Sequence, residues 1–294
     1  MKPYVSLAER AENAKNDLNE ITLRSLRTLR EKILREHPGS VMEKRLQKLV
    51  ELLAKRFENE EKKGQLTDLR DPFLVGAWLI LGEHSKKNGQ TRAYEALRRA
   101  KGVSPGQLLD ILPEKLQSVA QQAGPYEDAR AKRLYQFADD IEDKCGTDFA
   151  KIFTKPIKDA RQFLEKELKL SRAMADYMLM CAGDPVLALD ARAVRATSRL
   201  GYTKLKPEKD FNKAYLDLQK TLEAELPKKN PEWNIRAHGL LNRLGAEICR
   251  SGIPNCPSCP LLKECPYPKK HPEVYAAHAA AEAARAAQAA KYAR

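Results

Sequence analysis

Four of the six cysteines lie within residues 249–265, and this segment constrains the fold more than any other feature. Cys249, Cys256, Cys259 and Cys265 follow the spacing C-x6-C-x2-C-x5-C, and the prolines beside them force the backbone to turn. The four thiolates can therefore converge. Ligation by thiolates alone suits an iron–sulfur cluster or zinc. Because a structural zinc site usually shows two short-spaced ligand pairs and only one C-x2-C pair occurs here, we favour a 4Fe–4S cluster.

Charge and hydropathy restrict the class of protein. The chain of 294 residues has 53 Lys and Arg against 40 Asp and Glu, a formal net charge of +13. This excess favours a polyanionic partner such as nucleic acid or an anionic membrane surface. The longest apolar stretch, residues 73–82, is about half of what a bilayer-spanning helix needs, and the charged N-terminus lacks the apolar core of a signal peptide. We expect a soluble intracellular protein of the cytoplasm or nucleoid, with no membrane partner.

Wherever a period can be read, it is the period of a helix. Leu46, Leu49, Val50, Leu53 and Phe57 are spaced as one face of an amphipathic helix, with charged residues between them. No run alternates convincingly with period two and strand formers are sparse, so we predict an all-α fold. Turn signals predict four regions: N-terminal helices in 1–70 that pack with the cysteine lobe, a bundle of about six helices in 71–185, the cysteine lobe in 186–270, and an Ala-rich tail in 271–294.

The cysteine segment resembles the C-terminal cluster loop of the endonuclease III family of helix-hairpin-helix DNA glycosylases. The likeness also rests on residues 237–241 and Gly245 before the cysteines, residues 170–176 as the hairpin and the start of its second helix, residues 185–190 as the approach to a catalytic aspartate, and residues 122–126 as a glycine–tyrosine turn. It covers roughly residues 71–268. The resemblance implies a two-lobed all-α fold, a 4Fe–4S cluster away from the catalytic centre, and a monomeric enzyme acting on duplex DNA with a lesion or mismatch.

By this resemblance Asp190 is the catalytic residue. Breaking an N-glycosidic bond builds positive, oxocarbenium-like charge on the deoxyribose, and a nearby carboxylate stabilises that charge. The same carboxylate can orient or deprotonate the attacking water. An aspartate directly before a helical run is also a common N-cap, worth roughly 1 kcal/mol. The two roles can coexist in one side chain.

Two features depart from the pattern of the family: the residues that flank Leu170, and the residue at position 173. Lys169 and Ser171 flank Leu170 where the family usually has glycines, which let backbone N–H groups approach a phosphate closely. We expect weaker hairpin binding, or contacts from the Ser171 hydroxyl and the Arg172 guanidinium instead. Ala173 stands where bifunctional members place a lysine nucleophile, so we expect a monofunctional glycosylase that stops at the abasic site. The alternative is a bifunctional glycosylase and AP lyase in which Lys169 supplies the amine.

The resemblance also indicates residues that contact DNA. Glu83 and His84 follow an apolar helix where family members carry wedge and pocket residues, and Arg250 and Lys263 lie beside the cysteines where basic side chains meet phosphates. Solvated surface charge is the alternative for each of them. The predicted DNA-binding set is Leu170, Ser171, Arg172, Glu83, His84, Arg250 and Lys263.

Two other functions are also compatible with the sequence. The first is a non-catalytic DNA-binding member of the same fold, favoured by the altered hairpin and the missing lysine. The second is an electron-transfer or cluster-sensing protein, for which the basic surface is incidental. Tyr177 is interpreted as a core residue, because aromatic residues at helical spacing are mostly core. His238 is interpreted as a packed or hydrogen-bonded residue rather than a cluster ligand, because the four cysteines already complete the cluster.

Overall fold

The structure is a computed structural model that describes residues 45–57, 71–86, 88–227 and 230–292. These residues fall in one compact unit, Arg45–Arg294, and every regular element among them is a helix. The helices predicted in residues 1–44 and 58–70 lie outside the described residues. In the part of the chain that is described, no helix combines the length and apolarity that crossing a membrane requires.

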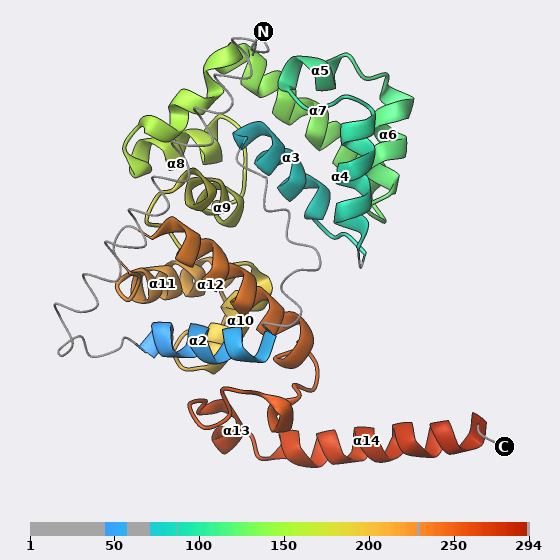
Figure 1. Cartoon of the computed structure of the whole chain (residues 1–294), viewed down its shortest axis with the longest axis vertical. Helices are drawn as coiled ribbons and strands as arrows, with labels where there is room; N and C mark the ends of the chain where they lie inside the picture. The colour runs from blue at the N-terminus through green and yellow to red at the C-terminus, as the bar shows by residue number, and fades with distance from the viewer. Residues whose placement is uncertain (1–44, 58–70, 87, 228–229, 293–294) are drawn as a thin grey trace, which may run out of the picture. The chain divides into compact units, whose positions relative to one another are not determined.

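A first hydrophobic core is built by the helices between residues 71 and 186 (Figure 1). These helices are α3 (Pro72–Gly82), α4 (Gly89–Arg99), α5 (Pro105–Leu109), α6 (Pro113–Gln121), α7 (Glu127–Lys144), the 3-10 helix η2 (Gly146–Thr154), α8 (Ile157–Lys166) and α9 (Arg172–Ala182). The sequence predicted about six helices here, and the described structure has seven α-helices and one 3-10 helix. The short α5 forms because Ser104 accepts a hydrogen bond from the Gln107 N–H and Pro105 occupies the first turn.

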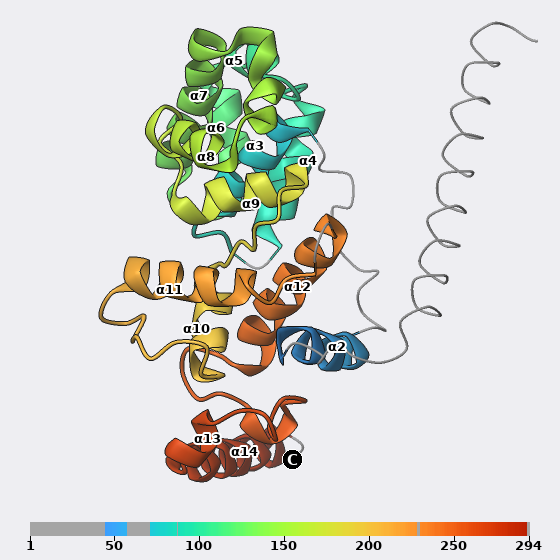
Figure 2. The same ribbon diagram turned by 90° about the vertical axis from the view of Figure 1, so that its left-hand side faces the viewer.

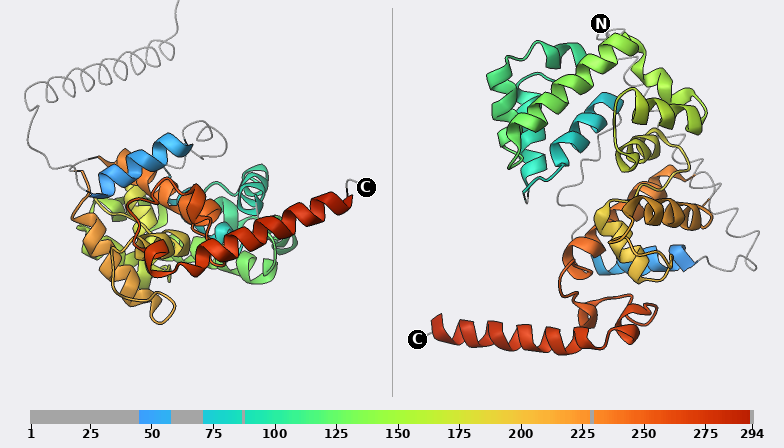
Figure 3. Two further views of the ribbon diagram at one scale, coloured as in Figure 1. Left: turned by 90° about the horizontal axis from the view of Figure 1, so that it is seen from below. Right: turned by 180° about the vertical axis from the view of Figure 1, so that it is seen from behind.

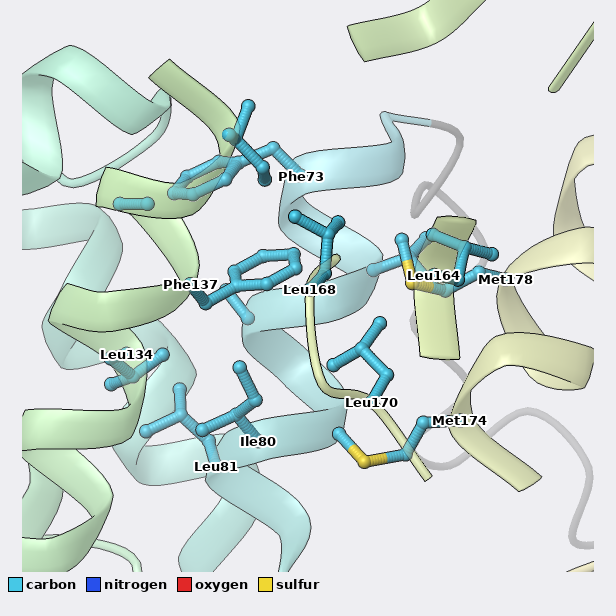
Figure 4. Close-up of a cluster of buried hydrophobic side chains, with 14 of the residues drawn as sticks. Phe73, Ile80, Leu81, Leu134, Phe137, Leu164, Leu168, Leu170, Met174 and Met178 are labelled. Carbon is cyan, nitrogen blue, oxygen red and sulfur yellow. The ribbon is translucent and has the colours of Figure 1, made fainter. Parts of the chain in front are cut away.

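Helix α3 lies at the centre of this first core. Asp71 caps it by accepting a hydrogen bond from the Leu74 N–H at 3.0 Å, and Pro72 begins it. Its residues are apolar on every side, as expected for a helix that other helices surround. The Phe137 ring of α7 stacks on Phe73 with centroids 5.9 Å apart, and leucines from several elements complete the cluster (Figure 4).

A second hydrophobic core joins the start of the described chain to its C-terminal half. It is formed by α2 (Arg45–Phe57), α10 (Ala191–Arg199), α11 (Phe211–Glu223), α12 (Pro231–Arg243) and the π-helix η3 (Leu244–Ile248) (Figure 2). Met180 of α9 also belongs to this cluster, whereas Met174 and Met178 of the same helix belong to the first core. Helix α9 therefore has side chains in both cores, and residues 186–190 lead from it into α10.

The cysteine segment follows η3 and contains little regular structure. Its elements are the 3-10 helix η4 (Cys256–Ser258) and α13 (Tyr267–Lys270), after which α14 (Glu273–Tyr292) closes the described chain. The Ala-rich tail is thus a helix, as its propensity favours. Helix α14 contacts η4, and most of its length extends away from the other helices in the right-hand view of Figure 3.

Candidate active site and cysteine loop

Asp190 is the N-cap of α10 and is held at both carboxylate oxygens. Its backbone is extended, with φ −83° and ψ 175°, and its Oδ1 accepts a hydrogen bond from the Ala193 N–H at 2.8 Å. The Nδ2 of Asn242 on α12 donates to Oδ2. A carboxylate at a helix N-terminus is also favoured by the helix dipole. The side chain is half-buried and its orientation is determined by two elements, so it is preorganised rather than free to rotate.

His238 and Tyr177 lie next to the segment that leads to Asp190. The Nδ1 of His238 is 2.9 Å from the Ala188 carbonyl oxygen, so Nδ1 carries the proton and donates. In the neutral ring, Nε2 is then the acceptor. Burial lowers the pKa of His238, against the opposing effects of that hydrogen bond and of the Asp190 carboxylate. The Tyr177 ring meets the imidazole edge-on at 4.9 Å.

Ala173 and Tyr177 lie one turn apart on α9, and both pack against the second core. Residues four apart on a helix share a face. Ala173 therefore points to the side of α9 on which Tyr177 meets His238. Ala173 carries only a methyl group, whereas Lys169 is an exposed residue of the turn before α9.

The turn between α8 and α9, residues 168–171, contains no glycine. Lys169 has φ +52°, a left-handed conformation that glycine adopts more easily than lysine. Leu168 and Leu170 on either side are buried in the first core (Figure 4). The Leu170 N–H donates to the Leu164 carbonyl oxygen at 3.0 Å, and Ser171 caps α9 by accepting from the Met174 N–H. Leu170 thus anchors the turn from inside, and Ser171 lies at its exposed end.

The guanidinium of Arg172 donates its hydrogen bonds to side chains of the protein itself. Its Nε donates to Asp176 Oδ2 at 2.9 Å, and its Nη2 donates to Gln219 Oε1 at 3.1 Å. Asp176, which has no exposed surface, also accepts from Arg161 Nε at 2.6 Å, from the Tyr215 hydroxyl at 2.8 Å and from Gln219 Nε2 at 2.8 Å. These donors come from α8, α9 and α11, so the carboxylate joins helices of the two cores. The contacts of Arg172 favour a structural role over the predicted phosphate contact.

Glu83 and His84 lie beside the glycine–tyrosine turn. Both are exposed, and the His84 ring meets the Tyr126 ring edge-on with centroids 5.7 Å apart. The two loops are tied together by Arg130, whose Nη2 donates to the Glu83 carbonyl oxygen at 2.7 Å and whose Nη1 donates to the Gly124 carbonyl oxygen at 3.3 Å. Tyr126 is 65% exposed with φ +66°, and His84 also has positive φ. Exposed aromatic residues held in such strained backbone are typical of functional loops.

The four cysteines line one pocket between α10, η3 and the cysteine loop. Burial raises the pKa of the Cys259 thiol to about 11, and the charges of the other three cysteines add to that rise. Arg199 approaches from α10, with Nη1 3.6 Å from Cys249 Sγ. Among the described residues, no group of three or more His, Cys, Asp or Glu side chains is gathered tightly enough for one metal ion.

Arg250 and Lys263 have exposed side chains at the border of the cysteine loop. The carbonyl oxygen of Arg250 accepts a hydrogen bond from Arg199 Nη1 at 2.8 Å, which holds its backbone against α10. Lys263 lies in the turn before Cys265. The structure therefore places both cations at the surface, where they can meet a polyanion.

The chain and its structure resemble known DNA glycosylases, although no protein-family model matches. The sequence is 24% identical over 223 residues to endonuclease III of Thermotoga maritima, covering 76% of this chain and 92% of that protein. The structure is similar to that of endonuclease III in a non-covalent DNA complex, with a TM-score of 0.59 at 23% identity over 80% of this chain and 100% of the other. A thermostable thymine-DNA glycosylase gives a TM-score of 0.60 at 16% identity over 76% and 97%. These likenesses confirm the predicted all-α fold.

Proposed function

We propose that this chain, a homologue of endonuclease III with the helix-hairpin-helix DNA glycosylase fold, is a base-excision repair glycosylase. It would hydrolyse the N-glycosidic bond of a damaged or mismatched base that has rotated out of duplex DNA. The observation that carries this proposal is the geometry of Asp190. A half-buried carboxylate held by the Ala193 N–H and by Asn242 suits the stabilisation of developing positive charge.

In this mechanism the Asp190 carboxylate faces the deoxyribose as the bond to the base breaks. The positive charge that develops near C1′ is stabilised by the carboxylate, which need not reorient because its two hydrogen bonds already hold it. The same group can orient or accept a proton from the water that attacks C1′. Asn242 acts through Asp190 as a positioning residue, and sequence spacing did not indicate it.

The lack of an amine at position 173 supports a monofunctional reaction. A lysine nucleophile would form a Schiff base with the sugar and lead on to strand cleavage. Ala173 cannot do this, and it lies on the face of α9 that also carries Tyr177, beside His238. Water is then the nucleophile, and the products are the free base and an abasic site.

We further propose that Cys249, Cys256, Cys259 and Cys265 hold a 4Fe–4S cluster. Four thiol donors around a single cavity fit such a group, because buried thiolates are costly unless cations neutralise them. When bound, the cluster would brace the loop structurally. The loop itself would present Arg250 and Lys263 to DNA phosphates.

Duplex DNA, bound by a monomer, is the proposed partner. Backbone N–H groups at the hairpin and the start of α9 would meet one strand, with the Ser171 hydroxyl at the exposed end of the turn. Glu83 and His84 would lie at the extruded nucleotide, beside Tyr126. Binding of this kind weakens steeply as salt rises, because phosphate contacts release counterions.

Base release by the purified protein tests this function. The assay uses a panel of duplexes that carry uracil or thymine mismatches, oxidised bases or alkylated bases, with borohydride present in a parallel set. We expect release of one class of base without a covalent adduct. A trapped adduct would favour the bifunctional alternative, and tight duplex binding without any released base would favour the non-catalytic one. Absorption near 400 nm with matching iron and sulfide content tests the cluster, whereas stoichiometric zinc would replace it.

A further inference from the structure

Lys169, the hairpin residue with a left-handed backbone, and its neighbour Leu168 both accept hydrogen bonds from another helix. Lys169 adopts φ +52°, a conformation that is less favourable in free energy for lysine than for glycine. Arg133 of α7, far away in sequence, donates through Nη2 to the carbonyl oxygens of Leu168 and Lys169. The contact to Leu168 is 3.4 Å long. One guanidinium thus holds two successive carbonyl groups at the turn itself.

A second cation of α7, Lys144, binds the backbone of Glu167 just before the turn. Lys144 Nζ donates to the Glu167 carbonyl oxygen at 3.3 Å, and Asp140 of the same helix accepts from that Nζ at 2.9 Å. Inside the protein, the Leu168 N–H donates to the Phe163 carbonyl oxygen and the Leu170 N–H donates to that of Leu164. The carbonyls of the turn therefore face α7, and its leucines face the core (Figure 4).

We propose that Arg133 takes over the role of the hairpin glycine by clamping Lys169 in the conformation that binds phosphate. The proposal rests on the proposed function for its ligand, a phosphate of the DNA backbone. Glycine adopts the left-handed conformation without strain, whereas lysine needs an external contact that is lost when the turn opens. Arg133 supplies this contact, and it is a positioning residue because it acts through the hairpin.

The charge of Arg133 serves the same purpose as its geometry. Carbonyl oxygens that face the DNA strand would repel its phosphates, whereas exposed N–H groups attract them. The guanidinium binds the carbonyls of Leu168 and Lys169, so the free end of the turn can present the N–H groups at the start of α9. A neutral residue at position 133 would leave these carbonyls without the cation.

A pair of double variants with equal charge tests the clamp. R133A/K169G and R133A/K169A both lose two positive charges, and they differ only in whether residue 169 adopts positive φ without strain. We expect R133A/K169G to bind a duplex with a tetrahydrofuran abasic analogue at least fivefold more tightly than R133A/K169A. With Arg133 present, K169G and K169A should differ by less than about twofold, because the clamp already holds the turn.

The neighbouring lysine supplies the control for charge. Lys132 is exposed on the same helix, so K132A removes one cation without touching the hairpin. We expect R133A to weaken duplex binding about tenfold, which is about 1.4 kcal/mol, and K132A to weaken it about twofold. Equal losses in R133A and K132A, or equal affinities of the two double variants, would overturn the clamp.

Amide hydrogen exchange at Leu170 reads the hairpin without DNA and separates the clamp from the proposed function. Its N–H is bonded to the Leu164 carbonyl oxygen only while the turn is formed. Exchange should be faster in R133A/K169A than in R133A/K169G by about the factor found for binding. Slow exchange in both double variants would show that Arg133 is not needed. Failure of the wild type to bind any duplex would overturn the proposed function, while the exchange result still decides the clamp.

Discussion

Replacing Asp190 separates its two roles, because Asn can keep the cap but cannot keep the charge. In Asp190→Asn, the amide oxygen can still accept from the Ala193 N–H, and a flip of the Asn242 amide restores the second hydrogen bond. We expect a loss of stability below about 1 kcal/mol. In Asp190→Ala both bonds are lost, and the cost is about 1 kcal/mol for the cap plus about 1 kcal/mol for the bond to Asn242.

The effect on catalysis should be the same in both variants and much larger than the effect on folding. Removing one preorganised group that stabilises transition-state charge typically costs a factor of about 10² to 10³, which corresponds to roughly 3 to 4 kcal/mol. Both variants should therefore lose base release to that extent under single-turnover conditions. Their affinity for an abasic-analogue duplex should stay near that of the wild type, since ground-state binding rests on phosphate contacts.

Asp210 is a matched control for the cap. It caps α11 by accepting a hydrogen bond from the Lys213 N–H at 3.0 Å, at a position with no part in the proposed chemistry. Asp210→Ala should lose about 1 kcal/mol of stability in denaturant titration and keep full base release. If Asp190→Asn were stable, bound DNA and released the base within tenfold of the wild-type rate, the catalytic assignment of Asp190 would be refuted.

Three further substitutions probe the surroundings of the site. Asp176→Asn removes the buried partner of two arginines and should lower the free energy of unfolding by about 3 kcal/mol in urea titration, whereas the exposed Asp139→Asn should change it little. Because burial lowers the pKa of His238, the unfolded chain binds its proton first, so stability should fall as pH drops below the usual value of 6.5; a His238→Gln variant with the same decline would contradict this. Gly245→Ala would place a Cβ 2.5 Å from the Arg192 carbonyl oxygen, so α10 and η3 must separate, and we expect about 1 to 3 kcal/mol of lost stability together with slower base release; an unchanged melting temperature would argue against that close contact.

Features that depend on near neighbours in the chain were readable from the sequence. The helical class followed from apolar spacing, and the cap at Asp190 followed from an acid placed before a helical run. The cysteine spacing likewise led to one cavity lined by all four residues. Short α5 was missed, because a Ser-Pro-Gly segment indicates a turn as readily as the first turn of a helix.

Contacts between residues far apart in the sequence could be identified only in the tertiary structure. Asn242 meets Asp190 across 52 positions, and Arg133 meets Lys169 across 36, so no periodic pattern connects either pair. The contact of Tyr177 with His238 is of the same kind, and it places both residues beside the segment that leads to Asp190.

The sequence by itself determined the helical class, the cap at Asp190 and the grouping of the cysteines, because each depends on residues within a few positions of one another. Tertiary packing decided how the carboxylate is oriented, what Arg172 binds and which carbonyl groups of the turn accept from Arg133. The physical reason is that a side chain's hydrogen-bond partner is set by which helix faces meet, and burial then makes that partner obligatory.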